Sequence, residues 1–134
     1  MAKIVLTNAN VQLAGTDISS YVKQVTLTTS VNEVETTAFG NTAKTRVAGL
    51  IDNKVQLSLQ QDYSTVEGLV YPLIGGTAVN LIVRPNGTGA ASTANPQYSM
   101  SVLCVEWMPV NGAVGDLAVA DVTWPIAGTI TKTP

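Results

Sequence analysis

The chain has 134 residues, the length of one ordinary domain; 46% of them are hydrophobic and only 12% are charged, about half the charged share of a typical soluble domain. The net charge is -2 and no basic run is present, which argues against tight binding to duplex nucleic acid. Because protein interfaces are depleted in charged side chains, this composition indicates a surface that is largely covered by other protein. The alternative is a weakly charged monomer coated with Thr, Ser, Asn and Gln.

Several kinds of catalytic and metal chemistry lack the residues they need. The chain has no histidine and a single cysteine, Cys104, so Ser-His-Asp and Cys-His arrangements, the usual zinc sites and an intramolecular disulfide are excluded. We therefore expect no catalytic residue, no metal ligand and no cofactor, and we expect Cys104 to be a small buried side chain. Paired carboxylates remain as a weaker, enzymatic alternative, since two of them suffice for glycoside hydrolysis. The pairs are Glu33 with Glu35, Asp52 with Asp62, and Asp116 with Asp121.

The first part of the chain predicts strands. Residues 2–6 and 10–13 have the composition of short strands. Hydrophobic and polar side chains then alternate over residues 23–31 and again over 54–60, which is the pattern of two half-buried strands. The N-terminal apolar run is too short for a signal peptide, and no apolar run approaches the roughly 20 residues of a membrane-spanning helix. We therefore expect a protein made in cytosol-like conditions, with no membrane partner.

Between the two alternating runs lies the most unusual stretch of the sequence, Thr36–Asp52, which is rich in threonine and glycine. Insertions of this length are uncommon in a compact domain and are usually binding elements or disordered. This one contains Phe39, Val47, Leu50 and Ile51, more apolar surface than an idle linker carries. We therefore predict a long extended loop arm, over residues 33–52 with its root included, that docks on another molecule.

A single helix is predicted over residues 64–74. Ser64 and Glu67 have the spacing of a capping box, in which the two side chains satisfy free donors at the start of a helix. Hydrophobic residues follow at helical spacing from Val66 to Leu73, so one side of the helix should pack on a sheet. Further strands are predicted at 77–84, 97–107, 117–124 and 126–131, and a mobile loop of small residues at 86–95.

Seven or eight strands with one helix indicate a mainly β protein. We expect a single domain over residues 1–134, built as a β-sandwich or a partly open barrel. The aromatic residues either belong to its core, which we favour, or form a platform for stacking sugars or bases. They are Tyr63, Tyr71, Tyr98, Trp107 and Trp124.

Three segments, in their order along the chain, resemble the tail tube (major tail) proteins of long-tailed bacteriophages. They are Glu35–Gly40 (ETTAFG), Arg46–Leu50 (RVAGL), and the strand that leads through Asp62-Tyr63 into the helix. The resemblance covers residues 17–85 well and the remainder only by strand content. It implies a β-barrel or sandwich with one flanking helix, assembled as stacked hexameric rings into a hollow tube that conducts DNA during ejection.

The resemblance implies that the arm contacts a neighbouring subunit or ring. Phe39, Leu50 and Ile51 would be its hydrophobic anchors, and Arg46 would meet a carboxylate there. That carboxylate would belong to Glu33 or Glu35, at the root of the arm.

The resemblance also implies that the polar side of the two strands flanking the arm faces the lumen. Short hydroxyl and amide groups offer no strong phosphate clamp, so DNA would slide past them. The alternative is that they face ordinary solvent or another subunit. The residues are Gln24, Thr26, Thr28, Ser30, Gln56, Ser58 and Gln60.

The partners implied by the resemblance are further copies of the chain, with tape-measure, tail-terminator and tail-tip proteins, and DNA in transient, non-specific passage. The location implied is the virion tail, after assembly in the host cytoplasm. Two rival readings fit the composition: a head-decoration or other small virion protein on a preformed shell, and a monomeric β-sandwich binding module. The arm distinguishes them, because only the tube hypothesis needs residues 39–48 for oligomerisation.

Overall fold

The computed structural model describes residues 5–134 and contains two antiparallel sheets. The larger sheet has the strand order β2-β1-β5-β6-β8. Its strands are β1 (Asn10–Leu13), β2 (Thr16–Asp17), β5 (Val79–Arg84), β6 (Gln97–Val102) and β8 (Thr131–Thr133). No helix in this part of the chain is long and apolar enough to cross a bilayer.

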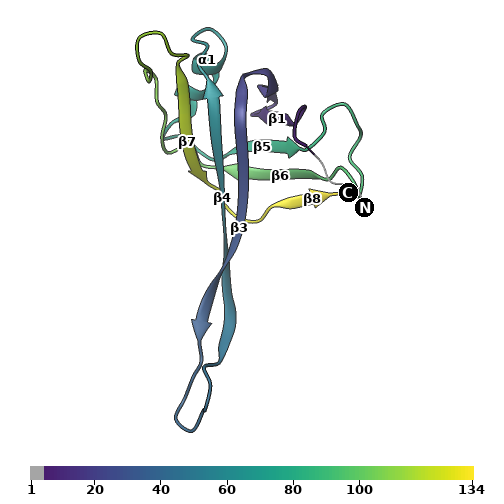
Figure 1. Cartoon of the computed structure of the whole chain (residues 1–134), viewed down its shortest axis with the longest axis vertical. Helices are drawn as coiled ribbons and strands as arrows, with labels where there is room; N and C mark the ends of the chain where they lie inside the picture. Colours follow the sequence, from purple (N-terminus) through teal and green to yellow (C-terminus); the bar gives the residue numbers. More distant parts are fainter. Residues whose placement is uncertain (1–4) are drawn as a thin grey trace.

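The smaller sheet has the order β3-β4-β7, from β3 (Val22–Glu35), β4 (Arg46–Gln60) and β7 (Val119–Pro125). Its strands cross those of the larger sheet at a steep angle, and its first two strands continue far beyond the body of the molecule (Figure 1). The mainly β sandwich expected from the sequence is confirmed, and the two sheets do not close into a barrel.

The core lies between the sheets because alternate residues of each strand face it. On β4, Val55, Leu57 and Leu59 are buried while the residues between them are exposed or half-buried. Trp124 of β7 is fully buried and Cys104 is almost so, which confirms the expectations that Cys104 is a buried side chain and that Trp124 is a core residue. The wider core consists of Val11, Leu13, Ile18, Val66, Val70, Leu81, Val83, Met100, Val102, Val122 and Ile126.

The predicted helix is present but short: α1 (Val66–Val70) continues as one 3-10 turn, η2 (Tyr71–Leu73). The predicted capping box does not form. Instead the Asp62 carboxylate accepts hydrogen bonds from the backbone N–H and the hydroxyl of Ser64, and from the N–H of Thr65. Glu67 is free for another role and accepts a hydrogen bond from the indole of Trp107. A second 3-10 turn, η1 (Ser19–Tyr21), precedes β3.

The predicted loop arm is a β-hairpin, and this differs from the expectation. β3 and β4 pair out to Glu35 and Arg46, so only residues 36–45 form a loop. The pairing shifts by one residue between Val31 and Glu33, opposite Gly49. A Cβ atom on Gly49 would lie 2.9 Å from the carbonyl oxygen of Asn32. Glycine therefore permits the bulge by which the ladder continues into the arm.

The remaining sequence-based boundaries are partly right. The predicted strand at 97–107 ends at Val102, because the following residues turn to lie along β7, where the N–H of Leu103 donates to the carbonyl of Pro125 at 3.0 Å. The predicted edge strand at 126–131 is mostly wrong: only Thr131 of it lies in a strand, β8, and Ile126 forms an isolated bridge with Val102. The predicted strand at 2–6 lies mostly outside the described residues, and Val5 and Leu6 are not in a strand.

Candidate assembly interface

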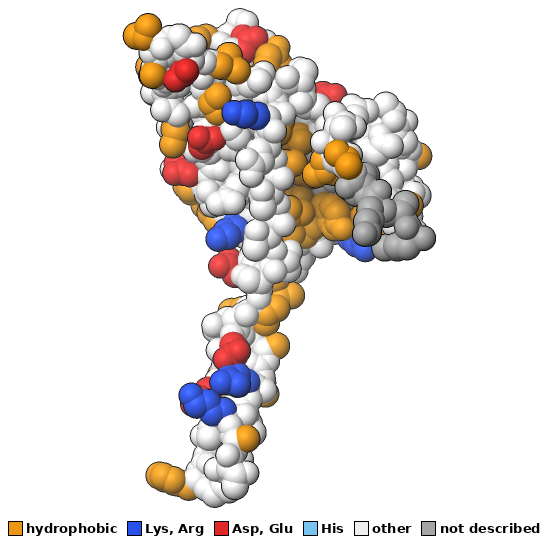
Figure 2. Space-filling view, in the orientation of Figure 1, with side chains coloured by type: hydrophobic (Ala, Val, Ile, Leu, Met, Phe, Trp, Pro, Cys, Tyr) orange, Lys and Arg blue, Asp and Glu red, His pale blue; other side chains and the backbone are white. Residues whose placement is uncertain are grey.

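Large hydrophobic side chains lie exposed along the whole hairpin arm. Phe39, in the loop at the tip, is fully exposed, and Leu50 is 85% exposed. Val31, Val34, Val47 and Ile51 are each about half exposed on the strands. Figure 2 shows hydrophobic side chains along one edge of the arm and at its tip. A two-stranded ribbon is at best marginally stable in water, and one with this much open apolar surface indicates an interaction site.

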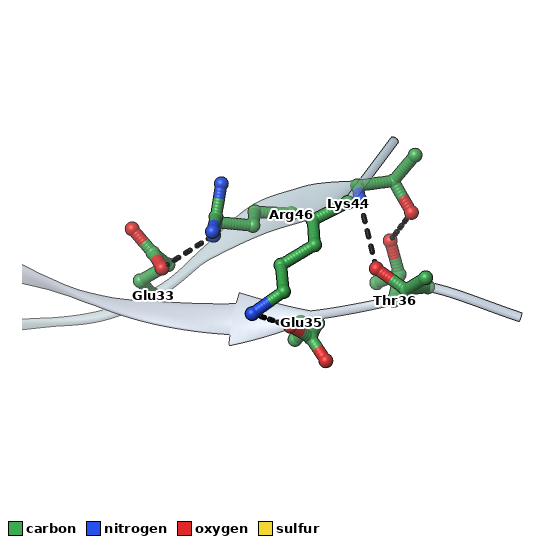
Figure 3. A network of polar contacts seen from close by, with 7 residues as sticks. Glu33, Glu35, Thr36, Lys44 and Arg46 are labelled. Carbon is green, nitrogen blue, oxygen red and sulfur yellow. Dashed lines mark hydrogen bonds and ion pairs between the residues drawn. The ribbon is translucent and has the colours of Figure 1, made fainter. Parts of the chain in front are cut away.

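Charged and hydroxyl side chains on the arm bind one another within the chain (Figure 3). The Nε of Arg46 lies 2.7 Å from a carboxylate oxygen of Glu33, and the Nζ of Lys44 lies 3.8 Å from one of Glu35. Arg46 thus has a carboxylate partner, Glu33, within its own chain, and a pairing between subunits stays a prediction. The physical reason is the hairpin register, which sets Arg46 opposite Glu35 and diagonal to Glu33.

Hydrogen bonds hold the loop of the arm in one shape. The hydroxyls of Thr36 and Thr45 lie 2.8 Å apart, and the N–H of Thr45 donates to the Thr37 hydroxyl at 2.9 Å. At the tip, the side-chain oxygen of Asn41 accepts from the N–H of Ala38 at 2.8 Å. Gly40 has φ +92°, a backbone conformation that favours glycine. These bonds form within the single chain, without a docked partner.

The seven polar residues predicted to face the lumen lie together on one face of the β3-β4-β7 sheet. The register sets Gln24 opposite Ser58 and Thr26 opposite Gln56, and the buried residues of β4 occupy the opposite face. Whether this polar face lines a lumen remains a prediction. It is the face of the sheet that points away from the core.

Sequence reasoning missed that β7 completes this polar face. Thr123 lies opposite Gln56, and Asp121 lies opposite Ser58. Lys54, opposite Thr28, and Asp52, opposite Ser30, also belong to it. The alternation of hydrophobic and polar residues over 117–124 indicates which side chains of β7 share a face. It does not indicate that β7 pairs with β4, which only the tertiary structure shows. The added charges are mixed, so the face carries no cationic cluster.

The two edges of this sheet differ in how well they are covered. The residues after β6 lie along β7: the Glu106 carboxylate accepts from the N–H of Thr123 at 2.6 Å, and Asn111 exchanges hydrogen bonds with Val119. Along β3, from Lys23 to Glu35, no outward backbone group has a hydrogen-bond partner among the described residues. A long uncovered edge is a template for pairing with another chain.

The aromatic residues do not gather into one platform. Trp124 is in the core, whereas Tyr63 and Tyr71 are exposed beside the helix. The Tyr63 hydroxyl donates to the carbonyl of Pro109 at 2.8 Å, which ties the helix region to the long loop after β6.

Several of the carboxylates have structural partners. Ser64 and Thr65 lower the pKa of Asp62 by donating hydrogen bonds to its carboxylate, the Ser64 hydroxyl most of all. Ser19 lowers the pKa of Asp17 in the same way. Residues 5–134 contain no group of three or more His, Cys, Asp and Glu side chains placed to hold a metal ion.

Comparison with known proteins finds similarity in structure alone. No family model and no curated protein matches the chain. A chain of the sheath/tube terminator of an extracellular contractile injection system, PVC, in its extended state, is similar with a TM-score of 0.75 and 10% identity, over 100% of this chain and 99% of that one.

Two further structures have the same fold over nearly the whole chain. A chain of the native gene transfer agent particle has a TM-score of 0.71 at 10% identity, covering 98% of this chain and 100% of that one. A chain of the tail of the empty gene transfer agent particle, solved with C6 symmetry, has a TM-score of 0.65 at 13% identity, covering 95% of each. At such identities the likeness establishes the fold, and it confirms at that level the resemblance found in the sequence.

Proposed function

We propose that this chain is the tail tube protein of a bacteriophage or phage-like particle, a structural subunit that assembles with copies of itself into stacked rings. The observation that carries the proposal is the fold, shared from end to end with chains of the gene transfer agent tail and of the PVC tube and sheath assembly. We take the rings to be hexameric, and the tube to be the conduit for DNA during ejection. The chain performs no enzymatic reaction in this role.

The uncovered edge of β3 supports lateral assembly. Its outward N–H and C=O groups, from Lys23 to Glu35, have no partners within residues 5–134. Pairing with a neighbouring copy would satisfy them and extend the sheet around the ring. Contact between two different surfaces of identical chains propagates from copy to copy. It closes into a ring when the rotation between copies allows it.

The hairpin arm supports contact between rings. From Val31 to Phe39 the arm spans eight residue steps, and a strand rises about 3.3 Å per residue, so its reach beyond the body is roughly 25 Å. Its exposed anchors, Phe39, Leu50 and Ile51, need a partner surface at that distance. The polar face of β3-β4-β7 is then left for the lumen, where its mixed charges and short hydroxyl and amide groups hold phosphates weakly.

In this role the protein lies in the virion tail after assembly in the host cytoplasm. Its partners are copies of itself, the tail-terminator and tail-tip proteins at the ends of the tube, and the tape-measure protein inside it.

A second candidate within the same assembly is the terminator that closes a tube, because one of the similar chains belongs to a sheath/tube terminator. The two roles differ in one physical property. A tube protein stacks on itself without limit, whereas a terminator forms a single ring with one face that accepts no further copy.

The test is electron microscopy of negatively stained, purified protein at high concentration, with sedimentation velocity on the same sample. Hollow tubes of stacked rings support the tube proposal. Single rings that never stack favour the terminator role. A monomer that persists even when tube ends of the same particle are added contradicts both, and favours a decoration protein or a monomeric binding module.

A further inference from the structure

The arm has a second uncovered edge, which belongs to β4. β7 pairs with β4 only from Lys54 to Gln60, and the N–H of Ile126 donates to the carbonyl of Asn53. Over residues 46–51, β4 pairs with β3 alone, and its outward backbone groups have no partner among the described residues. Figure 1 shows the two strands of the arm projecting from the body with no other strand beside them. Each edge of the arm is therefore a template for a further strand.

The two edges of the arm carry opposite charges. Glu33 and Glu35 lie on the β3 side, and Lys44 and Arg46 lie on the β4 side (Figure 3). All four side chains are about half exposed or more. The pair with Glu33 uses the Nε of Arg46, whereas a guanidinium has five N–H donors and a carboxylate has two acceptor oxygens. These groups can therefore bind a second partner while they keep the first.

We infer that the β3 edge of one arm pairs with the β4 edge of the neighbouring copy's arm in an antiparallel ladder, with the acidic residues of one copy beside the basic residues of the next. This inference rests on the proposed self-assembly and specifies which two edges meet. The contact joins two different surfaces of identical chains, so it is heterologous and repeats around a ring. The arms of one ring then form a continuous ribbon in which β3 and β4 alternate.

Strand direction supports this pairing. β4 runs antiparallel to β3 within the chain, and rotation about a ring axis leaves every copy of β3 running the same way along that axis. β4 of one copy and β3 of the next are therefore antiparallel, which is the slightly more stable arrangement. β7, by contrast, runs parallel to β3, because both are antiparallel to β4. Its edge is also partly covered already, by Glu106 at Thr123.

The other available edges fit less well. A two-fold contact between the β3 edges of two arms would bring four carboxylates together, and like charges on adjacent strands destabilise a sheet. In the larger sheet, the edge strands β2 and β8 have only two and three residues. The β4 edge of the arm is the one that offers both length and complementary charge.

The test is whether two proteins with opposite arm charges sort into separate rings. The inverted variant carries Glu33→Lys, Glu35→Lys, Lys44→Glu and Arg46→Glu. It keeps opposite charges paired within each arm, so its fold and its assembly on its own should match those of the wild type. Wherever an inverted copy lies beside a wild-type copy, however, the two facing edges carry like charges.

Wild-type protein labelled with ¹⁵N is mixed in equal amounts with inverted protein and assembled, and the rings are weighed by native mass spectrometry. We expect rings of mixed composition to be at least about threefold rarer than random mixing gives, because opposite-charge contacts become like-charge contacts. High salt should reduce the deficit. The matched control exchanges two exposed charges of the body, Asp116→Lys with Lys132→Glu, and should mix randomly with the wild type.

Random composition, or a preference for mixed rings, would overturn the inference and leave the proposed function standing. Failure of the folded inverted variant to assemble alone would also contradict it, because the same charge pairs are present with their signs exchanged. If wild-type protein forms neither rings nor tubes, the proposed function fails and takes this contact with it.

Disulfides test the same contact without changing any charge. Val34→Cys protein is mixed, in separate samples, with Thr45→Cys, Val47→Cys or Ile51→Cys protein, assembled, and oxidised mildly. All four positions are exposed, and the three on the β4 side allow for different registers of the two arms. The native thiol of Cys104 does not interfere, because burial raises its pKa to about 11 and thiolate is the reactive form.

We expect one of these mixtures to give disulfides from position 34 to the β4 side at least about tenfold in excess of those between two copies of position 34. In the inferred ribbon, a β4 strand separates the two copies of position 34, which places them about 10 Å apart. A disulfide needs Cα atoms within roughly 7 Å. An excess of disulfides between two copies of position 34, or none from this position in samples that contain rings or tubes, would contradict the inference.

Discussion

Arg46 shows how one residue's role depends on its strand register. Its sequence position suggested an ion pair with another subunit, yet in the single chain it is paired with Glu33 at 2.7 Å. Both side chains are about half exposed or more, and water screens such pairs. The pair therefore fixes the alignment of the two strands of the arm more than it adds to the stability of the fold.

We expect Arg46→Ala to lower the free energy of unfolding by less than about 1 kcal/mol, as is usual for exposed ion pairs. Urea denaturation followed by tryptophan fluorescence measures this. Lys44→Ala, which breaks the longer pair with Glu35, is the matched control and should have a smaller effect still. A loss above about 2 kcal/mol would show that the pair supports the body of the fold. Loss of assembly with intact stability would point to a contact between subunits.

Asp62 makes the stability of the protein depend on pH. Hydrogen bonds, first from the Ser64 hydroxyl, hold its pKa below the ordinary value in the folded chain. The unfolded chain therefore takes up the proton first as pH falls. The stabilisation is fully present above the unfolded pKa, near 4, and is lost as pH falls through the lower, folded pKa.

We expect Asp62→Asn to be less stable than the wild type at pH 7, and its stability to fall less steeply with acid below about pH 4. The amide oxygen keeps an acceptor at the start of the helix, so the fold should be retained. Urea titrations at pH 7, 5, 4 and 3 measure this. Ser64→Ala removes the main hydrogen-bond donor to the Asp62 carboxylate. Its stability should therefore also fall less steeply with acid than that of the wild type. Parallel curves for all three proteins would exclude the assigned cause.

At the scale of elements, the loop at 86–95 is braced by one side chain. Asn95, which is 9% exposed, accepts from the N–H of Asn86 and donates to its carbonyl, both at 2.9 Å. It also reaches the carbonyls of Gly89 and Ala90. The sequence predicted a mobile loop from its small residues. Mobility itself stays a prediction, but this asparagine limits how far the loop can open.

We expect Asn95→Ala to destabilise the protein by about 1–3 kcal/mol, because partly buried backbone groups of the loop lose their partner. Limited proteolysis should then cut within residues 86–95 faster than in the wild type. Thr93→Ala, at an exposed position of the same loop, is the control and should leave the rate unchanged. Equal cleavage of wild type and Asn95→Ala would mean that the loop is mobile despite these hydrogen bonds.

At the scale of the whole molecule, the proposed tube depends on which face of the β3-β4-β7 sheet meets DNA. The outer face is polar, and its charges, among them Lys54, Asp52 and Asp121, are mixed in sign. Added cations on a lumenal surface would bind phosphates and slow the passage of DNA.

We expect tubes carrying the triple substitution Thr26→Lys, Thr28→Lys and Ser58→Lys to retain DNA and to eject it more slowly, with an effect that salt weakens. Ejection from whole particles, followed by a fluorescent DNA dye, measures this. The control places three lysines at exposed loop positions, Thr77, Thr93 and Ala94. Normal ejection from the triple variant would count against the lumenal assignment, provided that the tubes assemble.

Much of the fold followed from local pattern. The alternation around 23–31 and 54–60 predicted the strands beside the arm, because a half-buried strand repeats every second residue. The helix was placed correctly, but its start was attributed to Ser64 and Glu67. The carboxylate that caps the helix belongs to Asp62, which lies just before the expected capping box. Glu67 instead accepts a hydrogen bond from Trp107, 40 residues later in the chain.

The sequence by itself determined that the protein is mainly β, that it is poor in charge, and that it carries an arm with apolar side chains and no catalytic histidine. These are properties of composition and of periods of two or 3.6 residues. The tertiary structure alone decided that the arm is a hairpin, that β7 joins the polar face, and that β3 and the arm part of β4 have uncovered edges. Each depends on contacts between residues far apart in the chain, and local periodicity does not encode which strand becomes the neighbour of which.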